Sequence, residues 1–340
     1  MLISLVYVFG RNVNMASIKR RVKKTMEPED VMLSEAFDNF INEKEALNKS
    51  KDTIRNYKLS YRLFCEYHGF DEEDVTVSTI TQNHIYKWMN SMKIDGTKPV
   101  TINHYLGDIR VFLYWCMDNG REYLAPFDIK LMEKQEEQLK LFTDEELELL
   151  LEKPHRGDSW AEWRCWAIVN WALGTGNRAS TICDVRIGDV DFIRREIMLR
   201  HTKNKKAQTI PLSSSLETVI KEYIRICRKE APKTGFLFPN VGDEQMTPSA
   251  VGQAFGRYCK RRGVDKSNIH GLRHNFARGW IRNGGNIYAL QQIMGHATLD
   301  MTRKYVKLFG EDLKQGFDEF NPLDTMKKSQ KRTQKVKKSY

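Results

Sequence analysis

The chain has 340 residues, of which 41% are hydrophobic and 29% are charged, and its formal net charge is +11 at pH 7. This length favours two domains over a single core, and this composition is ordinary for a soluble globular protein. The one apolar run, residues 2–9, is too short to cross a bilayer and lacks the charged lead and cleavage site of a signal peptide, so we expect a cytoplasmic protein and no membrane segment.

Residues 1–30 are predicted to be a basic, flexible segment. Residues 11–24 carry six basic and no acidic residues, and runs of like charge are typically disordered and often bind nucleic acid. Met15 is an alternative start, in which case residues 1–14 are not part of the protein. No folded domain is expected before residue 30.

Residues 31–125 are predicted to form a small bundle of helices without strands. Apolar residues follow helical spacing in residues 50–69, with Ser50 as the N-cap and Gly69 as the stop, and again in residues 102–116, where the stripe runs on to Gly120. The polar faces of these helices carry six cations: Lys51, Arg55, Lys58, Arg62, Lys87 and Arg110. The pattern leaves open whether they face solvent or DNA.

Residues 126–142 are predicted to be a charged linker, partly extended and partly helical, and residues 143–322 a mixed α/β domain. Thr143 and Glu146 match a capping box at the start of a helix. Further helices are predicted over residues 163–176, 247–263, 272–284, 287–296 and 301–309. In residues 191–212, apolar and polar residues alternate on both sides of a basic turn, which predicts a β-hairpin. The fold class is therefore mainly α with a small β-sheet.

Residues 323–340 are predicted to be a basic, flexible tail. Residues 327–340 hold seven basic and no acidic residues. Because residues 1–10 carry no charge, residues 25–326 have a net charge of −2. The positive charge therefore lies in the two arms, which we expect to contact nucleic acid or, alternatively, to keep the protein soluble.

The second domain contains six candidate functional residues, each of which is a weak signal alone: Arg178, Lys203, His270, Arg273, His296 and Tyr305. His270 and His274 have the spacing of a zinc helix, but the usual glutamate is absent and Arg273 lies between them, so a cation would be repelled. The six cysteines form no CxxC pair and are expected to be reduced. No hydrolase elbow, Walker loop or dinucleotide fingerprint is present. We expect neither a metal nor a cofactor.

These residue types suit attack on a phosphodiester. Phosphoryl transfer builds negative charge on oxygen, and a pair of arginines can stabilise this charge through bidentate contacts. A tyrosine phenol, with an ordinary pKa of about 10, would be the nucleophile. Nearby arginines are expected to lower this pKa, and a lysine on the hairpin would protonate the leaving oxygen.

At these positions the sequence resembles the tyrosine recombinase, or phage integrase, family. The family's motifs are matched in order: "GTGNRAS" at Arg178, "TKNKKAQTIPL" at Lys203, "HGLRHNFA" at His270 and Arg273, and "IMGHATLDMTRKYV" at His296 and Tyr305. One departure is Thr181, where the family usually has an acidic residue three positions after its first arginine. Support for that arginine is then expected from elsewhere, such as Asp184.

The resemblance implies a fold and a mechanism. Residues 31–125 would be a helical core-binding (SAM-like) domain and residues 143–322 the catalytic domain. Tyr305 would attack a scissile phosphate and form a 3′-phosphotyrosyl link, with Arg178, Arg273 and His296 on the phosphate. Lys203 would be the general acid and His270 the base. The stretch 309–324 resembles the family's C-terminal helix, which contacts a neighbouring protomer.

The implied partners are double-stranded DNA and three further copies of the chain, in a homotetramer on paired sites that is a monomer or dimer off DNA. Accessory DNA-bending or directionality proteins are possible, and a bacterial or phage origin with action at the nucleoid is implied. Two alternatives stay open. One is a type IB topoisomerase-like activity without strand exchange, and the other is a DNA-binding regulator that has lost the chemistry. The sequence does not separate mobile-element movement from chromosome resolution.

Overall fold

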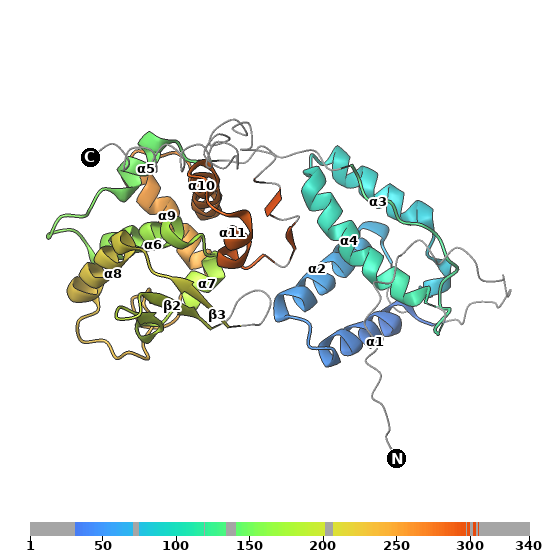
Figure 1. Ribbon diagram of the computed structural model, residues 1–340. Helices are drawn as coiled ribbons and strands as arrows, with labels where there is room; N and C mark the ends of the chain where they lie inside the picture. The colour runs from blue at the N-terminus through green and yellow to red at the C-terminus, as the bar shows by residue number, and fades with distance from the viewer. Residues whose placement is uncertain are drawn as a thin grey trace, which may run out of the picture. The chain divides into compact units, whose positions relative to one another are not determined.

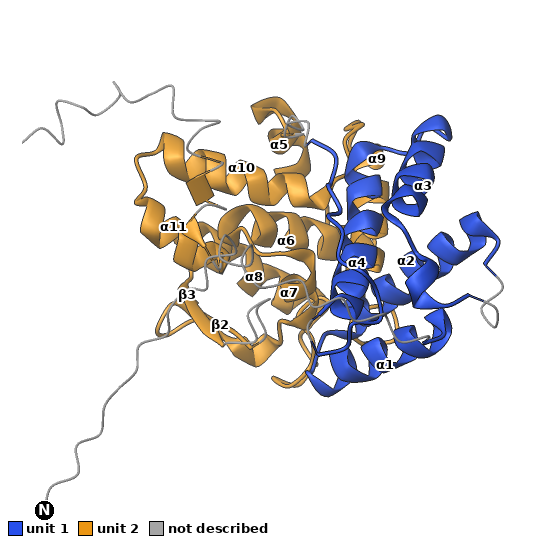
Figure 2. Ribbon diagram, turned by 90° about the vertical axis from the view of Figure 1, so that its right-hand side faces the viewer, with its two compact units in different colours: residues 1–137 blue, residues 138–340 orange. Residues whose placement is uncertain are grey.

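The computed structural model describes residues 31–70, 75–118, 120–133, 141–200, 207–296, 298–299, 302–303 and 305. The chain divides into two compact units, residues 1–137 and residues 138–340 (Figures 1 and 2). The boundary between them falls inside the predicted linker. The predicted arms, Lys203 and residues 309–324 lie outside the described residues. The predicted fold class, mainly α with a small β-sheet, is confirmed.

The regular elements in the described residues of the first unit are helices, together with one isolated β-bridge between Met32 and Thr76. Its elements are α1 (Leu33–Ala46), α2 (Lys51–His68), the short 3-10 helix η2 (Val77–Thr79), α3 (Gln82–Ile94) and α4 (Pro99–Cys116). The Ser50 hydroxyl accepts a hydrogen bond from the Thr53 backbone N–H at 3.1 Å, and Gly69 ends α2 at a φ of 61°. Both predicted boundaries of α2 are therefore confirmed.

Helix α4 ends earlier than its apolar stripe predicted. The helix stops at Cys116, because the Tyr123 backbone N–H bonds to the Cys116 carbonyl at 3.0 Å and turns the chain back. The core beneath it is aromatic. The rings of Phe37 and Tyr61 stack at 3.8 Å, and Phe112 meets Phe37 edge-on at 5.2 Å. These rings join α1, α2 and α4 into one bundle.

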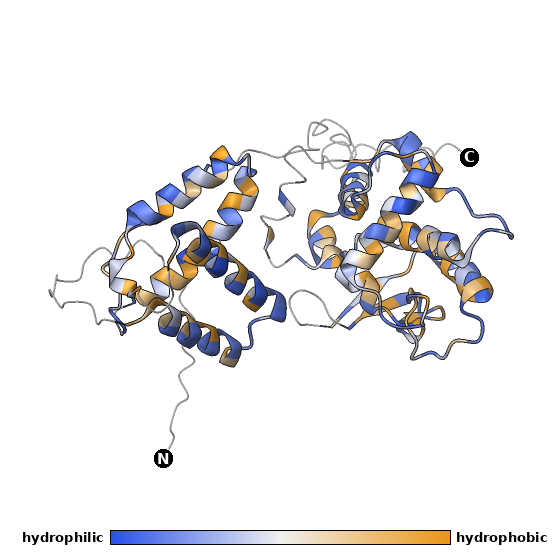
Figure 3. Ribbon diagram, turned by 180° about the vertical axis from the view of Figure 1, so that it is seen from behind, coloured by the Kyte–Doolittle hydropathy of each residue, from blue (hydrophilic) through white to orange (hydrophobic). Residues whose placement is uncertain are grey.

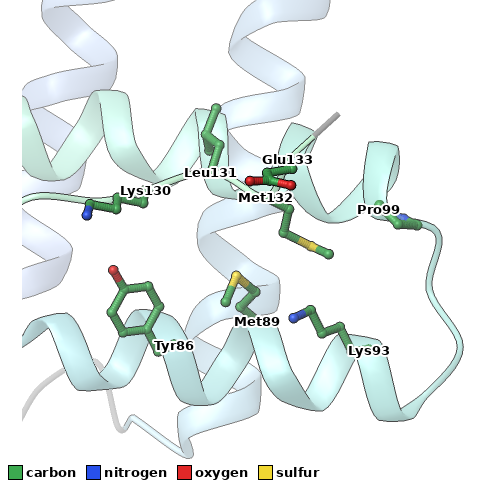
Figure 4. Close-up of a pocket in the computed structure, with 8 residues that line it drawn as sticks. All are labelled: Tyr86, Met89, Lys93, Pro99, Lys130, Leu131, Met132 and Glu133. Carbon is green, nitrogen blue, oxygen red and sulfur yellow. The ribbon is translucent and has the colours of Figure 1, made fainter. Parts of the chain in front are cut away.

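The start of the predicted linker packs on the first unit. The Asn103 side chain exchanges two hydrogen bonds with the backbone of Met132, at 2.8 and 3.0 Å. Residues 126–133 contain no helix, and the expected helical part falls on residues outside the description. Residues 130–133 form one wall of a pocket of about 390 Å³, which Tyr86, Met89 and Lys93 of α3 close from the other side (Figure 4).

The second unit combines helices with one small antiparallel sheet in the order β1-β2-β3. Its strands are β1 (Val190–Asp191), β2 (Glu196–Leu199) and β3 (Gln208–Pro211), preceded by the 3-10 helix η3 (Ile187–Asp189). Its helices are α5 (Asp144–Leu151), α6 (Trp160–Thr175), α7 (Ala179–Asp184), α8 (Ser214–Cys227), α9 (Pro248–Arg261), α10 (Ile269–Arg282) and α11 (Ile287–Met294). The predicted hairpin pairs Ile197 with Ile210. Helix α8 was not predicted from the sequence.

Helix α6 is the central element of the second unit. Eleven of its residues are buried, and it packs against both α8 and α10. The capping box before α5 is present, with the Thr143 backbone N–H donating to Glu146 at 2.8 Å. Hydrophobic and hydrophilic residues alternate along the helices of both units (Figure 3). No helix in the described part of the chain is long and apolar enough to span a membrane.

Candidate active site

The turn after α6 fixes the position of the first candidate arginine. Gly176 has a φ of 63°, and a Cβ on this residue would lie 2.4 Å from a ring carbon of Phe276 on α10. Glycine is therefore required both by the left-handed backbone and by the close approach of α10. The chain then continues to Arg178, which is the N-cap residue of α7 and is half-buried. This turn holds Arg178 beside the N-terminal half of α10.

Arg273 is the buried centre of the site, with 2% of its surface exposed. Its Nη1 atom donates to the Gly176 carbonyl at 2.5 Å, and its Nη2 atom donates to the Met294 carbonyl at 3.0 Å and to His296 Nε2 at 2.7 Å. Burial lowers the pKa of Arg273 to about 10, with a further contribution from the charge of Arg178. The side chain is thus charged at neutral pH and held rigidly between two backbone turns.

The contacts of His296 define its tautomer. Because a guanidinium only donates, the Nε2 atom that faces Arg273 must be unprotonated. The proton is then on Nδ1, which lies 2.8 Å from the hydroxyl oxygen of Thr302. Burial, followed by the charges of Arg273 and Arg178, lowers the pKa of His296 to about 4. The ring is therefore neutral at pH 7 and connects α11 to the residues just before Tyr305.

Tyr305 lies against these groups, with 6% of its surface exposed. Its hydroxyl oxygen lies 2.8 Å from His274 Nδ1, and Arg273 is close enough to act on the pKa of the phenol. Its ring is parallel to that of His296, with 6.2 Å between centroids. Burial raises the pKa of the phenol, and this outweighs the lowering by Arg273 and Arg178. The expected lowering by the arginines is present, but burial, which was not considered in the prediction, has the larger effect.

Two histidines lie one turn apart on the outer face of α10. His270 is the most exposed of the assembled candidate residues, and its ring meets that of His274 edge-on at 5.0 Å. Packing around the ring, and then the charges of Arg273 and Arg178, lower the pKa of His270. For His274, burial, and then His270 and Arg273, lower the pKa to about 4. Both rings are neutral at pH 7.

Five of the six predicted site residues lie together in the second unit: Arg178, His270, Arg273, His296 and Tyr305. Lys203 is outside the described residues, so its place in the site stays a prediction. Thr181, the departure from the family motif, is buried. Asp184 accepts a hydrogen bond from Gln245 at 3.4 Å, and its support of Arg178 also stays a prediction.

Two residues contribute to the site that were not predicted from the sequence to do so. His274 was weighed only as a zinc ligand, although it follows Arg273 directly and lies one turn from His270. Thr302 was not considered, although it lies three residues before Tyr305 and contacts His296. Spacing along a helix was the available signal for His274. For Thr302 the sequence offered none, because its partner is reached through a turn.

The assembled groups suit a bound phosphodiester. Two guanidinium groups and two neutral imidazoles surround one phenol hydroxyl in a largely buried setting, where charge interactions are stronger than in water. Such a set stabilises negative charge on oxygen and offers a nucleophile with one proton acceptor, His274, at hydrogen-bonding distance.

Comparison with known proteins identifies the family to which this chain belongs. The profile of the Phage integrase family matches residues 140–311, which is half of the chain. The tyrosine recombinase XerA of Pyrococcus furiosus is 27% identical over 300 residues, which cover 88% of this chain and 98% of that protein. A tyrosine recombinase of Thermosipho africanus is 26% identical and covers 77% of this chain and 91% of that protein.

Solved structures share the fold at lower identity. The Tn1549 transposon integrase in complex with transposon right end DNA has a TM-score of 0.64 and 20% identity, and covers 81% of this chain and 94% of that chain. A lambda integrase(75-356) dimer bound to a COC' core site has a TM-score of 0.61 and 17% identity, and the match covers 80% of this chain and 97% of that chain.

Proposed function

Since this chain belongs to the phage integrase family and is a tyrosine recombinase, we propose that it cuts and rejoins DNA through a covalent bond to Tyr305. The observation that carries this proposal is the placement of the Tyr305 hydroxyl. It lies 2.8 Å from a nitrogen of His274 and within the electrostatic reach of Arg273 and Arg178. A phenol in a structural role would need only one hydrogen-bond partner, whereas this one is surrounded by groups that bind phosphate.

The proposed reaction is a transesterification. The Tyr305 oxygen attacks the scissile phosphorus, the bond from phosphorus to the 5′-oxygen breaks, and a 3′-phosphotyrosyl diester forms. Arg178 and Arg273 bind the phosphate oxygens, and Lys203 protonates the departing 5′-oxygen. The phosphate contact expected for His296 would require its ring to exchange one of its present partners, Arg273 or Thr302. One diester replaces another, so the step is reversible and needs no external energy source. Rejoining follows the same path backwards, with a 5′-hydroxyl as the attacking group.

A proton acceptor is needed because the phenol is protonated at neutral pH. Burial raises its pKa above the ordinary value, so free phenolate is scarce. The family resemblance gives the role of base to His270, which lies in the site but faces His274 edge-on. Either histidine of this pair, being neutral at pH 7, has a lone pair that could take the proton.

We assign DNA binding to both units and strand exchange to a homotetramer on paired sites. In the first unit, cations of α2 project into solvent, where Arg55 and Arg62 form exposed ion pairs with Asp52 and Glu66 at 2.9 and 3.4 Å. Exposed pairs of this kind are weak, so phosphates can replace the carboxylates. The basic arms would add non-specific affinity. The cellular role is integration and excision of a mobile element or resolution of DNA.

The test is covalent capture on a nicked "suicide" duplex, in which the cleaved end diffuses away and traps the adduct. Wild-type protein is expected to form an adduct that resists detergent, and Tyr305→Phe is expected to form none while binding DNA normally. The matched control is Tyr258→Phe, which removes a buried hydroxyl that donates to the Leu150 carbonyl at 2.9 Å. Adducts that persist with Tyr305→Phe would reject the assignment.

A second assay separates recombination from topoisomerase-like cleavage. Two duplexes of different length, each with the target site, are mixed with the protein. Recombination gives joint products of new length, and cleavage with simple resealing returns only the starting lengths. The covalent-capture assay on the nicked duplex rejects the DNA-binding regulator alternative if any adduct forms.

A further inference from the structure

The side chain of His274 touches the nucleophile, although the family resemblance assigns it no role. Its Nδ1 atom lies 2.8 Å from the Tyr305 hydroxyl oxygen, and the ring centroids are 5.5 Å apart. The contact joins α10 to a residue that follows α11, so it forms only when the chain folds back onto α10. The side chain is half-buried and lies next to Arg273 in the sequence.

The direction of this hydrogen bond follows from the other partner of the phenol. The Arg273 guanidinium is close enough to the phenol to lower its pKa, but a guanidinium has no acceptor atom. Of these two neighbours, only His274 can therefore take the proton of the hydroxyl. Because the pKa of His274 is lowered to about 4, its ring is neutral at pH 7. A neutral ring with its proton on Nε2 presents the Nδ1 lone pair to the phenol.

We propose that His274 is the catalytic proton acceptor for Tyr305, an assignment that rests on the proposed cleavage reaction. As the phenol oxygen bonds to phosphorus, its proton moves to Nδ1 of His274, and the ring becomes an imidazolium with protons on both nitrogens. The bond from phosphorus to the 5′-oxygen breaks, and that oxygen takes a proton from the general acid. In rejoining, His274 returns its proton to the Tyr305 oxygen, so protons balance over the cycle.

The charges around His274 explain how a ring that is hard to protonate can accept this proton. The groups that face it are His270 and Arg273 of α10 and the phenol of Tyr305, and Arg178 of α7 acts on the same phenol. All the charged members are positive, so they disfavour imidazolium until an anion binds. A phosphodiester held by the two arginines adds negative charge beside the ring, which raises the pKa of His274 at the moment of attack.

His270 has a different setting. Its ring meets that of His274 edge-on, and it is the exposed member of the pair. This geometry suits contact with a phosphate oxygen. The two histidines of "HGLRH" therefore have different roles: His274 contacts the nucleophile, and His270 contacts the substrate.

The test compares His274→Asn with the matched variant His270→Asn, both in the full chain. Asparagine keeps a hydrogen-bond acceptor near the place of Nδ1 but does not take a proton, so a merely structural contact would survive. Single-turnover adduct formation on the nicked duplex is expected to fall by roughly 10²- to 10⁴-fold with His274→Asn. The thermal melt and DNA affinity are expected to match the wild type. His270→Asn is expected to weaken substrate contact and to keep the wild-type dependence of rate on pH.

The pH profile gives a readout that a structural role would not move. For wild-type protein the cleavage rate should stay level between about pH 6 and about pH 8, because His274 is already neutral. With His274→Asn only ionised phenol attacks, so the rate should rise about tenfold per pH unit. In a further substrate, sulfur replaces the bridging 5′-oxygen, and this leaving group needs no general acid. With this substrate, cleavage by Lys203→Ala should be restored, whereas cleavage by His274→Asn should stay low.

The assignment is overturned by a wild-type rate in His274→Asn, by rescue of that variant with the sulfur substrate, or by a tenfold rise per pH unit in the wild type. The pH dependence of the wild-type cleavage rate tests the role of His274 even if His274→Asn does not fold. Failure of the proposed function would look different, because the wild-type protein itself would then form no adduct.

Discussion

Gly176 packs against Phe276 and also accepts a hydrogen bond from Arg273 of the candidate site. Replacing it with alanine forces a side chain into left-handed backbone, since its φ is 63°, at a cost of about 1–2 kcal/mol. The new Cβ would also lie 2.4 Å from Phe276, and overpacking of this kind costs about 1–3 kcal/mol more. We therefore expect Gly176→Ala to destabilise the second unit by roughly 2–5 kcal/mol. The carbonyl of Gly176 accepts from Arg273, so cleavage should fall as well.

The control is Gly263→Ala, because Gly263 has a φ of 72° and nothing within 4 Å of a Cβ. It should cost only the backbone strain of about 1–2 kcal/mol and leave cleavage unchanged. Hydrogen exchange of the buried α6 amides reports on the stability of the second unit alone. Equal losses of stability in the two variants would refute the role of the Phe276 contact. Full cleavage by Gly176→Ala would refute its link to Arg273.

Three further predictions concern charge. Arg178→Ala and Arg273→Ala should each reduce adduct formation by roughly 10²-fold or more, since each removes a donor to the transition state, and wild-type rates in either would show that the pair is misplaced. Deleting residues 327–340 should reduce the slope of log affinity against log salt concentration by up to about 0.9 for each phosphate that the tail neutralises. An unchanged slope would show that the tail does not contact DNA. Because the pKa values of His274 and His296 are about 4 in the folded chain and about 6.5 when unfolded, the unfolded chain binds more protons between these values. Stability should thus fall as pH drops from about 6.5 to about 4, by at most about 1.4 kcal/mol per pH unit for each histidine, and a flat unfolding free energy over that range would contradict the burial of these rings.

The sequence predicted those features that depend on a few neighbouring residues. The ends of α2 at Ser50 and Gly69 were predicted, and so was the capping box of α5, made by Thr143 and Glu146. These features are predictable because caps are made by contacts within one turn. The end of α4 was placed wrongly, since a loop hydrogen bond from Tyr123 to Cys116 stops the helix and spacing alone does not reveal it.

The candidate site divides in the same way. The residue types and order pointed to Arg273 and Tyr305, because the chemistry of phosphate attack requires such groups. The lowering of the phenol pKa by the arginines was predicted, but the larger raising by burial was not, since burial depends on the folded surroundings of the ring. His274 was assigned no role because its partner lies 31 positions away, and only the folded chain brings the two together.

The central claim is that one particular hydroxyl becomes bonded to DNA, and peptide mapping tests it most directly. The trapped adduct is digested with nuclease and then cleaved before aspartate residues, which releases residues 300–311, where Tyr305 is the sole tyrosine. Mass spectrometry should find the nucleotide mass on this peptide and, after fragmentation, on Tyr305. A nucleotide on any other residue, or none in an adduct-positive sample, would contradict the account.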